Sequence, residues 1–457
     1  MEDERPITHR PTPPRRGLLA RLLRLDVPVP ERTPGERAVE VRRNYSWNFG
    51  VNLLDGVAFW LGISLASSST ILPLFISKLT ESPLPVGLLA IVAQGGWFFP
   101  QLFTANAVEQ LPRRKPVVIN LGLFLERLPW WLLILAPLLA LDTPAMAVVI
   151  VLVAYSWHTL GAGLVATAWQ DLIARIIPVE RRGLFMGLTS ALGTGAGALG
   201  ALLSAYVIEA YAFPRNFFYL FIGSASFITL SWFFLSLTRE PVVPITGTRR
   251  SSGEFWSRLP AILRSDRNFR RYLVARSLMA LGAMGAGFVT LSAVRRWQVP
   301  DGMVGQYTLA LLAGQASGNL LLGLAADRFG HKRNMVIGTA AGTLAFIIAW
   351  LAPAPTWYYA VFVLQGVAGA SIFVSGIVLV MEFCPPEEIP TYTGLGNTLA
   401  GAAGLVAPLI GTALASANYR LLFGASAVVN LLSCVLMNWW VREPRWTEGR
   451  ERETGAR

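Results

Sequence analysis

The chain has 457 residues, of which 53% are hydrophobic and only 14% charged, and its mean hydropathy is +0.49. Soluble domains carry roughly 25% charged residues, so this composition excludes an ordinary soluble protein. Its two cysteines, Cys384 and Cys434, are too few for a disulfide framework or a cysteine metal site.

The chain begins with a basic tail, residues 1–47, that is rich in proline and arginine. Leucines within residues 15–25 recur at helical spacing opposite arginines. This pattern fits a helix lying on the membrane surface and fits a disordered tail equally well.

Twelve apolar runs follow, each about as long as the roughly 20 residues that a helix needs to cross a bilayer. The expected spans are 48–76, 86–108, 117–140, 146–170, 184–208, 217–237, 272–293, 304–326, 335–352, 357–381, 393–414 and 418–440. Helices are expected because hydrocarbon cannot satisfy an unpaired backbone amide. The sequence therefore predicts an all-α membrane protein.

The polar segment 238–271 separates six spans from six, which predicts two six-helix bundles, 48–237 and 272–440, and a second tail, 441–457. Within the linker, residues 253–265 place an apolar stripe on one face and predict a helix at the membrane surface. Pro260 should be tolerated only if it lies in the first turn of that helix, where its missing N–H does no harm.

Basic residues gather on one side of the predicted membrane. If the N-terminus is cytoplasmic, 32 of the 39 lysines and arginines lie on that side. This bias places both termini in the cytoplasm of a protein of the cell, or inner, membrane. The net charge of +12 then faces anionic lipid, and a nucleic-acid partner is not expected.

An internal repeat relates the two halves. An offset of 218 carries Gly87 onto Gly305 and Glu109 onto Asp327. The same offset carries the basic run Arg113, Arg114 and Lys115 onto His331, Lys332 and Arg333. A duplicated architecture is the simplest reason for such a match.

The segment GLAADRFGHKR, residues 323–333, resembles the signature loop of the major facilitator superfamily, G-x-x-x-D-R-x-G-[RH]-K-R. Gly323, Asp327, Arg328, Gly330, Lys332 and Arg333 occupy its positions. Residues 176–187 and 364–370 resemble further segments of that family. The resemblance implies two six-helix bundles related by a pseudo-twofold axis along the membrane normal, with a midplane substrate site lined by spans 1, 4, 7 and 10.

The signature residues suggest a cytoplasmic gate. Asp327 should lie at the N-terminus of span 5, near Gly183, where the helix dipole stabilises a carboxylate. Glu109 should make the mirror contact near Pro390. Gly323 should allow close helix packing and Gly330 a tight turn. Arg113, Arg114 and Lys115, like Arg328, Lys332 and Arg333, should pair with acids or face lipid phosphates. Glu387 and Glu388 are the expected partners of Arg113, Arg114 and Lys115. The alternative is that the basic residues only determine how the chain is oriented in the membrane.

Ionisable or polar groups inside spans are the candidates for a substrate or ion pathway, because burying them in a membrane is costly. They are Asn52, Asp55, Glu126, Arg127, Trp157, His158, Arg276 and Gln365. Each also has a structural interpretation, such as a neutral His158 bonded to a backbone carbonyl. Adjacent helical residues point about 100° apart, so Glu126 and Arg127 are expected to bond to different neighbours. The charged set is concentrated in the first half, which predicts an asymmetric polar centre there.

Departures from the family restrict the function. Trp157 stands where the resemblance implies an arginine in proton-coupled drug exporters, and Gly200-Ala201 replaces their Gly-Pro pair. The sequence favours a monomeric secondary transporter for a small molecule, with protons as a possible coupling ion and no cofactor. The alternative is a non-transporting sensor or assembly factor on the same fold. No enzyme motif such as H-E-x-x-H or G-x-S-x-G occurs.

Overall fold

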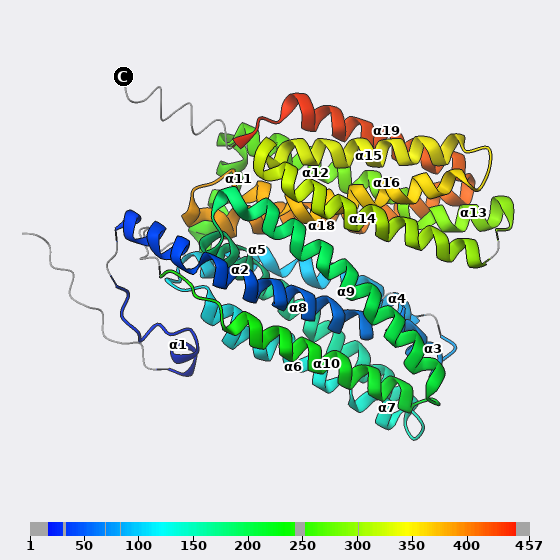
Figure 1. Cartoon of the computed structure of the whole chain (residues 1–457), viewed down its shortest axis with the longest axis horizontal. Helices are drawn as coiled ribbons and strands as arrows, with labels where there is room; N and C mark the ends of the chain where they lie inside the picture. The colour runs from blue at the N-terminus through cyan, green and yellow to red at the C-terminus, as the bar shows by residue number, and fades with distance from the viewer. Residues whose placement is uncertain are drawn as a thin grey trace, which may run out of the picture.

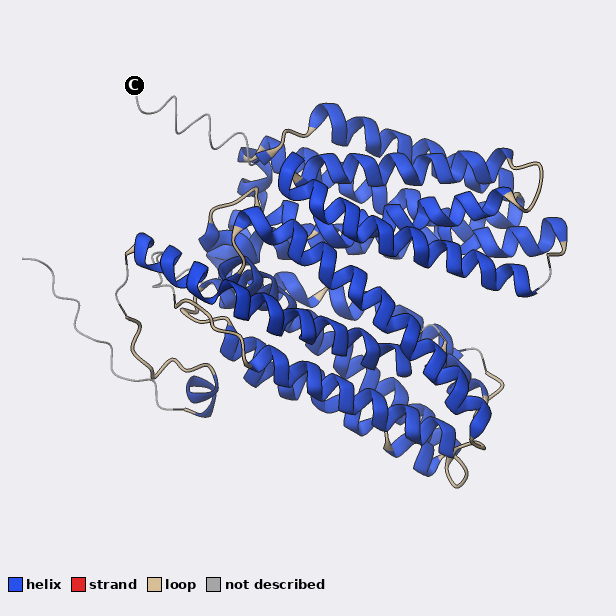
Figure 2. Cartoon of the chain, in the orientation of Figure 1, coloured by secondary structure: helices blue, strands red, loops and turns tan. Residues whose placement is uncertain are grey.

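The computed structural model describes residues 17–30, 33–68, 70–82, 84–242, 252–299 and 301–444, and every regular element among them is a helix (Figure 2). Ten helical segments of this described part are long and apolar enough to cross a membrane. The prediction of an all-α membrane protein is confirmed.

The first half begins with α1 (Leu18–Leu22) and ends with α10 (Arg215–Ser236). Between them lie α2 (Pro34–Leu65), α3 (Ile71–Ser77), α4 (Leu84–Phe98), α5 (Pro100–Glu109), the π-helical turns η1 (Val117–Leu121) and η2 (Leu123–Arg127), α6 (Leu128–Leu132), α7 (Leu135–Leu139), α8 (Pro144–Ile176), η3 (Val179–Arg181) and α9 (Arg182–Ala210).

The linker contributes α11 (Ser252–Ser265). The second half comprises α12 (Arg267–Gly282), η4 (Ala283–Phe288), α13 (Val289–Trp297), α14 (Asp301–Phe329), α15 (His331–Leu351), α16 (Trp357–Ser371), η5 (Ile372–Gly376), α17 (Val378–Met381), η6 (Pro386–Glu388), α18 (Ile389–Ala417), α19 (Tyr419–Val435) and η7 (Leu436–Trp440).

Two expected spans fall outside the set of ten because shorter helices compose them. Residues 86–108 are divided between α4 and α5, and residues 272–293 pass through the 3-10 stretch η4. The first span also starts earlier than expected. The Thr33 hydroxyl accepts from the Glu36 N–H at 3.3 Å, and the Glu36 carboxylate accepts from the Thr33 N–H at 2.8 Å. This capping box begins α2 at Pro34, well before the apolar run.

Figure 1 shows the helices in two groups that lie side by side. Helices α2 to α10 form one group and α12 to α19 the other, and the groups meet where α9 packs against α14 and α5 against α18. Helix α11 lies at one end of the molecule, with the basic loops around residues 113–115 and 328–333. We call this the basic end, and the end near α3, α7 and α13 the far end (Figure 1).

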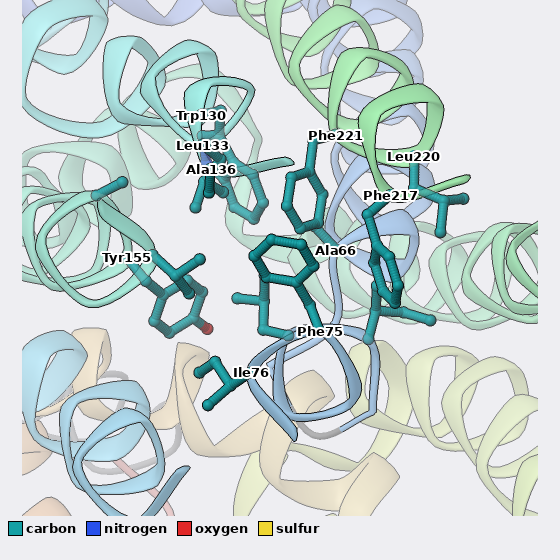
Figure 3. Packing of buried hydrophobic residues seen from close by; sticks show 14 of the residues in the cluster. Ala66, Phe75, Ile76, Trp130, Leu133, Ala136, Tyr155, Phe217, Leu220 and Phe221 are labelled. Atoms are coloured by element: carbon teal, nitrogen blue, oxygen red, sulfur yellow. The ribbon is translucent and has the colours of Figure 1, made fainter. Parts of the chain in front are cut away.

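Aromatic packing fills the far half of the first group. Phe75 of α3 contacts Phe217 and Phe221 of α10, with ring centroids 5.0 and 5.5 Å apart (Figure 3). Trp130 and Tyr155 close the same cluster. In a membrane, lipid competes for apolar surface, so close van der Waals packing of this kind holds helices together.

The linker forms the expected helix, α11, and its place at the membrane surface stays a prediction. Phe255, Leu259 and Ile262 are buried in a cluster with residues of both groups of helices, so the apolar stripe packs on protein. One expectation was wrong, because Pro260 sits inside the helix, beyond its first turn. It is tolerated because it lies on the exposed face, where solvent can bond to the carbonyl left without its helical partner.

The two halves repeat the same side-chain contacts. Asn48 and Arg239 exchange two hydrogen bonds, of 2.9 and 2.8 Å, and Asn268 and Arg442 exchange two of 3.0 and 2.8 Å. Each pair fastens the first span of its half to the end of the last. The repeat read from the sequence is therefore visible in the interactions.

Candidate functional site

A carboxylate from the second half caps a helix of the first half at the basic end. Asp327, near the end of α14, accepts from the N–H of Gly183 and of Leu184, each at 2.8 Å. Both amides belong to the first turn of α9, which has no side-chain cap of its own. This is the contact that the signature spacing predicts, and it joins the halves through a charge at the positive end of a helix dipole.

The mirror contact is present as well. Glu109, at the end of α5, accepts from the Thr391 N–H at 3.0 Å and from the Thr391 hydroxyl. Thr391 lies in the first turn of α18. We call these two interactions the paired latches.

The basic residues have partners other than the expected ones. Arg113 donates to the carbonyls of Arg24, Val27 and Pro28. Arg114 donates from Nε to Asp171 at 2.5 Å. The expectation that Glu387 or Glu388 pairs with them was wrong for Glu388, which takes Arg258 of α11 as its partner. Helix α11 reaches that carboxylate because its apolar stripe holds it against the bundle.

A carboxylate that the sequence analysis left without a role caps the basic run. Glu240 accepts from the backbone N–H of Arg114 at 2.6 Å and of Lys115 at 2.9 Å. In the second half, Glu443 accepts from the Lys332 N–H at 3.0 Å. The two carboxylates belong to matching triplets of the sequence, Arg239-Glu240-Pro241 and Arg442-Glu443-Pro444, which thus serve as matching helix caps. Burial raises the pKa of Glu240, and nearby Arg175 opposes that rise.

Glycines make the close approach at the basic end possible. A Cβ added to Gly323 would lie 2.8 Å from the Gly187 Cα, so α9 and α14 cross with their backbones in contact. Gly330 has φ +88°, which favours glycine, and it ends α14 where α15 begins. The last basic residues of the loop are close to aromatic rings or carbonyls: Arg328 and Arg333 lie over Phe329, and Lys332 Nζ donates to the Asn438 carbonyl.

An outer cavity of about 640 Å³ lies between the halves toward the far end. Residues of α2, α9 and α14 line it, with Phe373 of η5. The described lining carries hydroxyl and amide groups, among them Ser64, Thr194, Gln315 and Asn319, and includes no ionisable side chain. The resemblance implied spans 1, 4, 7 and 10. Spans 5 and 8 take the place of 4 and 7 in this lining, because α9 and α14 diverge beyond their crossing.

A smaller inner chamber of about 180 Å³ lies nearer the basic end. It shares Trp60, Ser190 and Phe373 with the outer cavity. The rings of Trp60 and Phe373 meet edge to face, with centroids 6.0 Å apart. This aromatic pair, one ring from each half, stands between the two spaces.

In the described lining of the inner chamber, the charged side chains are Asp55, Glu126 and Arg127. Asp55 is 8% exposed and accepts from the Ser231 hydroxyl at 2.6 Å. Asn52 also lines the chamber, while its amide nitrogen donates to the Asn48 carbonyl and the Thr238 hydroxyl. All three charged residues of the chamber are among those that stand out in the sequence as charges within apolar spans.

Glu126 and Arg127 are paired with each other, contrary to expectation. Arg127 Nη1 lies 3.7 Å from Glu126 Oε1. The residues lie in the π-helical turn η2, whose wider winding alters the angle between neighbours. Arg127 also stacks on Phe59, with Cζ 5.0 Å from the ring centroid.

His158 and two other candidates line neither space. His158 Nδ1 lies 3.0 Å from both Trp130 Nε1 and the Glu126 carbonyl oxygen, so the ring is held in the packed core. Trp157 is 40% exposed on the outside of α8. Gln365 is half-buried, and its Nε2 has no hydrogen-bond partner among the described residues.

Arg276 belongs to a buried network that sequence reasoning missed. Its Nη2 donates to Asn397 Oδ1 at 2.9 Å, and Asn397 Nδ2 donates to Gln101 at 2.7 Å and Gln170 at 3.4 Å. The network joins α12 and α18 of the second half to α5 and α8 of the first. An amide in an apolar run is the signal that could have found it.

The family model described as Major Facilitator Superfamily matches residues 296–456. The chain is 33% identical over 140 residues to Solute carrier family 22 member 1 of Oryctolagus cuniculus, a match covering 30% of this chain and 25% of that protein. It is 24% identical over 192 residues to the uncharacterized MFS-type transporter YfkF of Bacillus subtilis, covering 40% and 48%. The chain thus spans between a quarter and about half of these curated relatives.

Two solved structures resemble almost the whole chain. The E. coli fucose:proton symporter gives a TM-score of 0.69 at 13% identity, covering 87% of this chain and all of that one. A bacterial homologue of the iron transporter ferroportin, in its outward-facing state, gives 0.64 at 13% identity, covering 86% and 98%. At these identities the likeness concerns the fold.

Proposed function

We propose that this chain, a member of the major facilitator superfamily, is a secondary transporter that moves a small molecule across the cell membrane by alternating access. One observation carries the proposal. The paired latches join the halves at the basic end, whereas the outer cavity of about 640 Å³ lies between them toward the far end. A path closed at one end and hollow at the other is one state of such a transporter.

In this proposal the basic end faces the cytoplasm, with both termini there, and the structure is the outward-facing state. Twelve spans form two six-helix bundles, 48–237 and 272–440, related by a pseudo-twofold axis. The recurring Asn48–Arg239 and Asn268–Arg442 contacts support that relation. Basic side chains at this end would meet lipid phosphates, and the transporter works as a monomer.

Asp55 is the proposed proton carrier. It lines the inner chamber at 8% exposure, and Ser231 holds its orientation. Glu126 and Arg127, 3.7 Å apart, set the charge around it. His158, enclosed by Trp130 and the Glu126 carbonyl, has the structural role of holding η2 against α8.

The test is whether the two ends open in alternation. Ala198 lines the outer cavity, whereas Leu199, the next residue, is 65% exposed and does not. An Ala198→Cys thiol should react with a membrane-impermeant reagent, and loosening a latch by Asp327→Asn should slow that reaction. Leu199→Cys is the matched control, whose reactivity should not change. If Ala198→Cys reacts equally fast with and without the latch, alternating access is wrong.

Coupling is tested in proteoliposomes once a solute is known. Asp55→Asn should abolish accumulation driven by a pH gradient while exchange of labelled for unlabelled solute continues. Normal accumulation by Asp55→Asn would exclude this carboxyl as the carrier.

A further inference from the structure

We propose that the inner chamber binds the charged group of a small organic cation, and that this cation and a proton compete for the same negative charge. The inference rests on the proposed function and names the substrate class of the same path. It depends on three features of the chamber: its net charge, its unpartnered polar atoms and its aromatic walls.

The first feature is the net charge of the inner chamber. Among the described residues that line the chamber, the ionisable side chains are Asp55 on α2 and Glu126 and Arg127 on η2. Lining residues from α4, α8, α9, α10 and η5 are uncharged, and His158 of α8 meets only the backbone side of Glu126. Two carboxylates and one guanidinium leave one negative charge in an enclosed, apolar setting. Such a charge is costly unless one positive charge accompanies it.

The chamber also contains buried polar atoms that make no hydrogen bond to the described residues. Arg127 Nε and Nη1, Asn52 Oδ1 and Thr189 Oγ1 are buried without a hydrogen bond among the described residues. All three residues line the chamber, and Arg127 is only 5% exposed. Buried polar groups normally find partners, so a chamber with both donors and an acceptor unmatched is built for a polar guest.

The walls favour an organic cation over a bare ion. Phe59, Trp60, Trp97, Trp169 and Phe185 line the chamber. Aromatic faces attract cations through their quadrupoles, and aromatic cages are a known way to bind ammonium groups. At about 180 Å³ the chamber holds a small head group. Because Trp60 and Phe373 also line the outer cavity, the uncharged remainder of a longer molecule would extend there.

The test compares three probes of similar size with purified protein by calorimetry: choline, its uncharged isostere dimethylbutanol, and the anion trimethylacetate. Choline should bind at least about tenfold more tightly than dimethylbutanol, since one ion pair at this depth exceeds the roughly 1.4 kcal/mol that tenfold requires. Its affinity should fall as pH is lowered, because a proton takes the same charge. Binding that favours trimethylacetate, or no binding of any probe, overturns the proposal.

Substitutions of the acidic and the basic residues should change choline binding in opposite directions. Asp55→Asn and Glu126→Gln each bring the chamber to zero net charge and should weaken choline binding by at least about tenfold. Arg127→Gln brings it to two negative charges and should leave choline binding equal or tighter. If Arg127→Gln abolishes choline binding in protein that keeps its unfolding temperature, the net negative charge of the chamber does not govern binding and the proposal is wrong. Alternation of Ala198→Cys reactivity needs no ligand, so the substrate class can fail while the transporter proposal stands.

Discussion

Replacing Asp327 by asparagine should open the basic end by a calculable amount. The carboxylate accepts two hydrogen bonds from backbone N–H groups, both 2.8 Å long. Hydrogen bonds to a charged group contribute about 1.5–3 kcal/mol each, and the helix dipole adds roughly 0.3–1 kcal/mol. Asparagine keeps one acceptor oxygen but no charge. The closed state should therefore lose about 2–3 kcal/mol of stabilisation. This loss shifts the equilibrium between the closed and open states toward opening roughly 30- to 150-fold.

A native thiol reports this opening. Cys384 is 6% exposed in the cluster that seals the basic end, and burial raises its thiol pKa, so it reacts slowly while that end is closed. With Cys434 replaced by serine, maleimide labelling of Cys384 measures the open population. Labelling should accelerate by the factor given above in Asp327→Asn. Asp142→Asn, the same change at an exposed far-end position, should have no effect.

The result that refutes the reasoning is an unchanged labelling rate in Asp327→Asn protein that elutes and unfolds like its parent. The carboxylate would then cap α9 without holding the halves together. Faster labelling with a large fall in unfolding temperature would also count against it, since the latch should shift an equilibrium between folded states.

Three other substitutions test the same end. Glu109→Gln should also accelerate labelling of Cys384, because the closed state loses a charged acceptor for the first turn of α18. Gly187→Ala should lower the unfolding temperature, at a cost of about 1–3 kcal/mol of stability, because the added Cβ would lie 2.7 Å from the Gly323 Cα. The control is Gly195→Ala on the same helix, whose Cβ would meet nothing within 4 Å and which should be neutral or stabilising. Glu240→Gln should remove one contribution to the pH dependence of stability. Because the pKa of the Glu240 carboxyl is raised, the folded chain holds the carboxyl proton more tightly than the unfolded chain does. Its contribution to stability therefore falls as pH rises from the ordinary glutamate pKa through the raised one, and thermal unfolding at several pH values measures that slope.

Much of the fold was predictable because a membrane simplifies the physics. Hydropathy located the helices, and the spacing of Gly323, Asp327 and Gly330 located the latch, since both depend on residues close in sequence. Helix breaks within spans were not predictable: η4 and the π-turn η2 depend on packing against neighbours. Glu126 and Arg127 lie in that π-turn and come within 3.7 Å of each other, against the ordinary helical rule.

The candidate site was predicted in part for the same reason. Asp55, Glu126 and Arg127 stand out because a charge in an apolar run is rare. Which way a side chain faces is set by tertiary contacts, so Trp157 on the outside of α8 and His158 in the core could not be told from cavity residues. Asn397 and Gln101 were missed because uncharged amides are less conspicuous than charges, although they join the halves.

The crossing of α9 and α14 has a mechanical meaning. A Cβ added at Gly187 or Gly323 would meet backbone atoms of the other helix, so no side chain separates the helices at this point and they can swivel there. The crossing point does not lie at the middle of α14. From Gly323, α14 extends six residues to Phe329 and twenty-two to Asp301, or about 9 Å against about 33 Å at 1.5 Å per residue. A tilt that moves Asp327 just far enough to lose a 2.8 Å hydrogen bond would swing the opposite tip several times as far. A small release at the basic end thereby becomes a large closing movement at the far end.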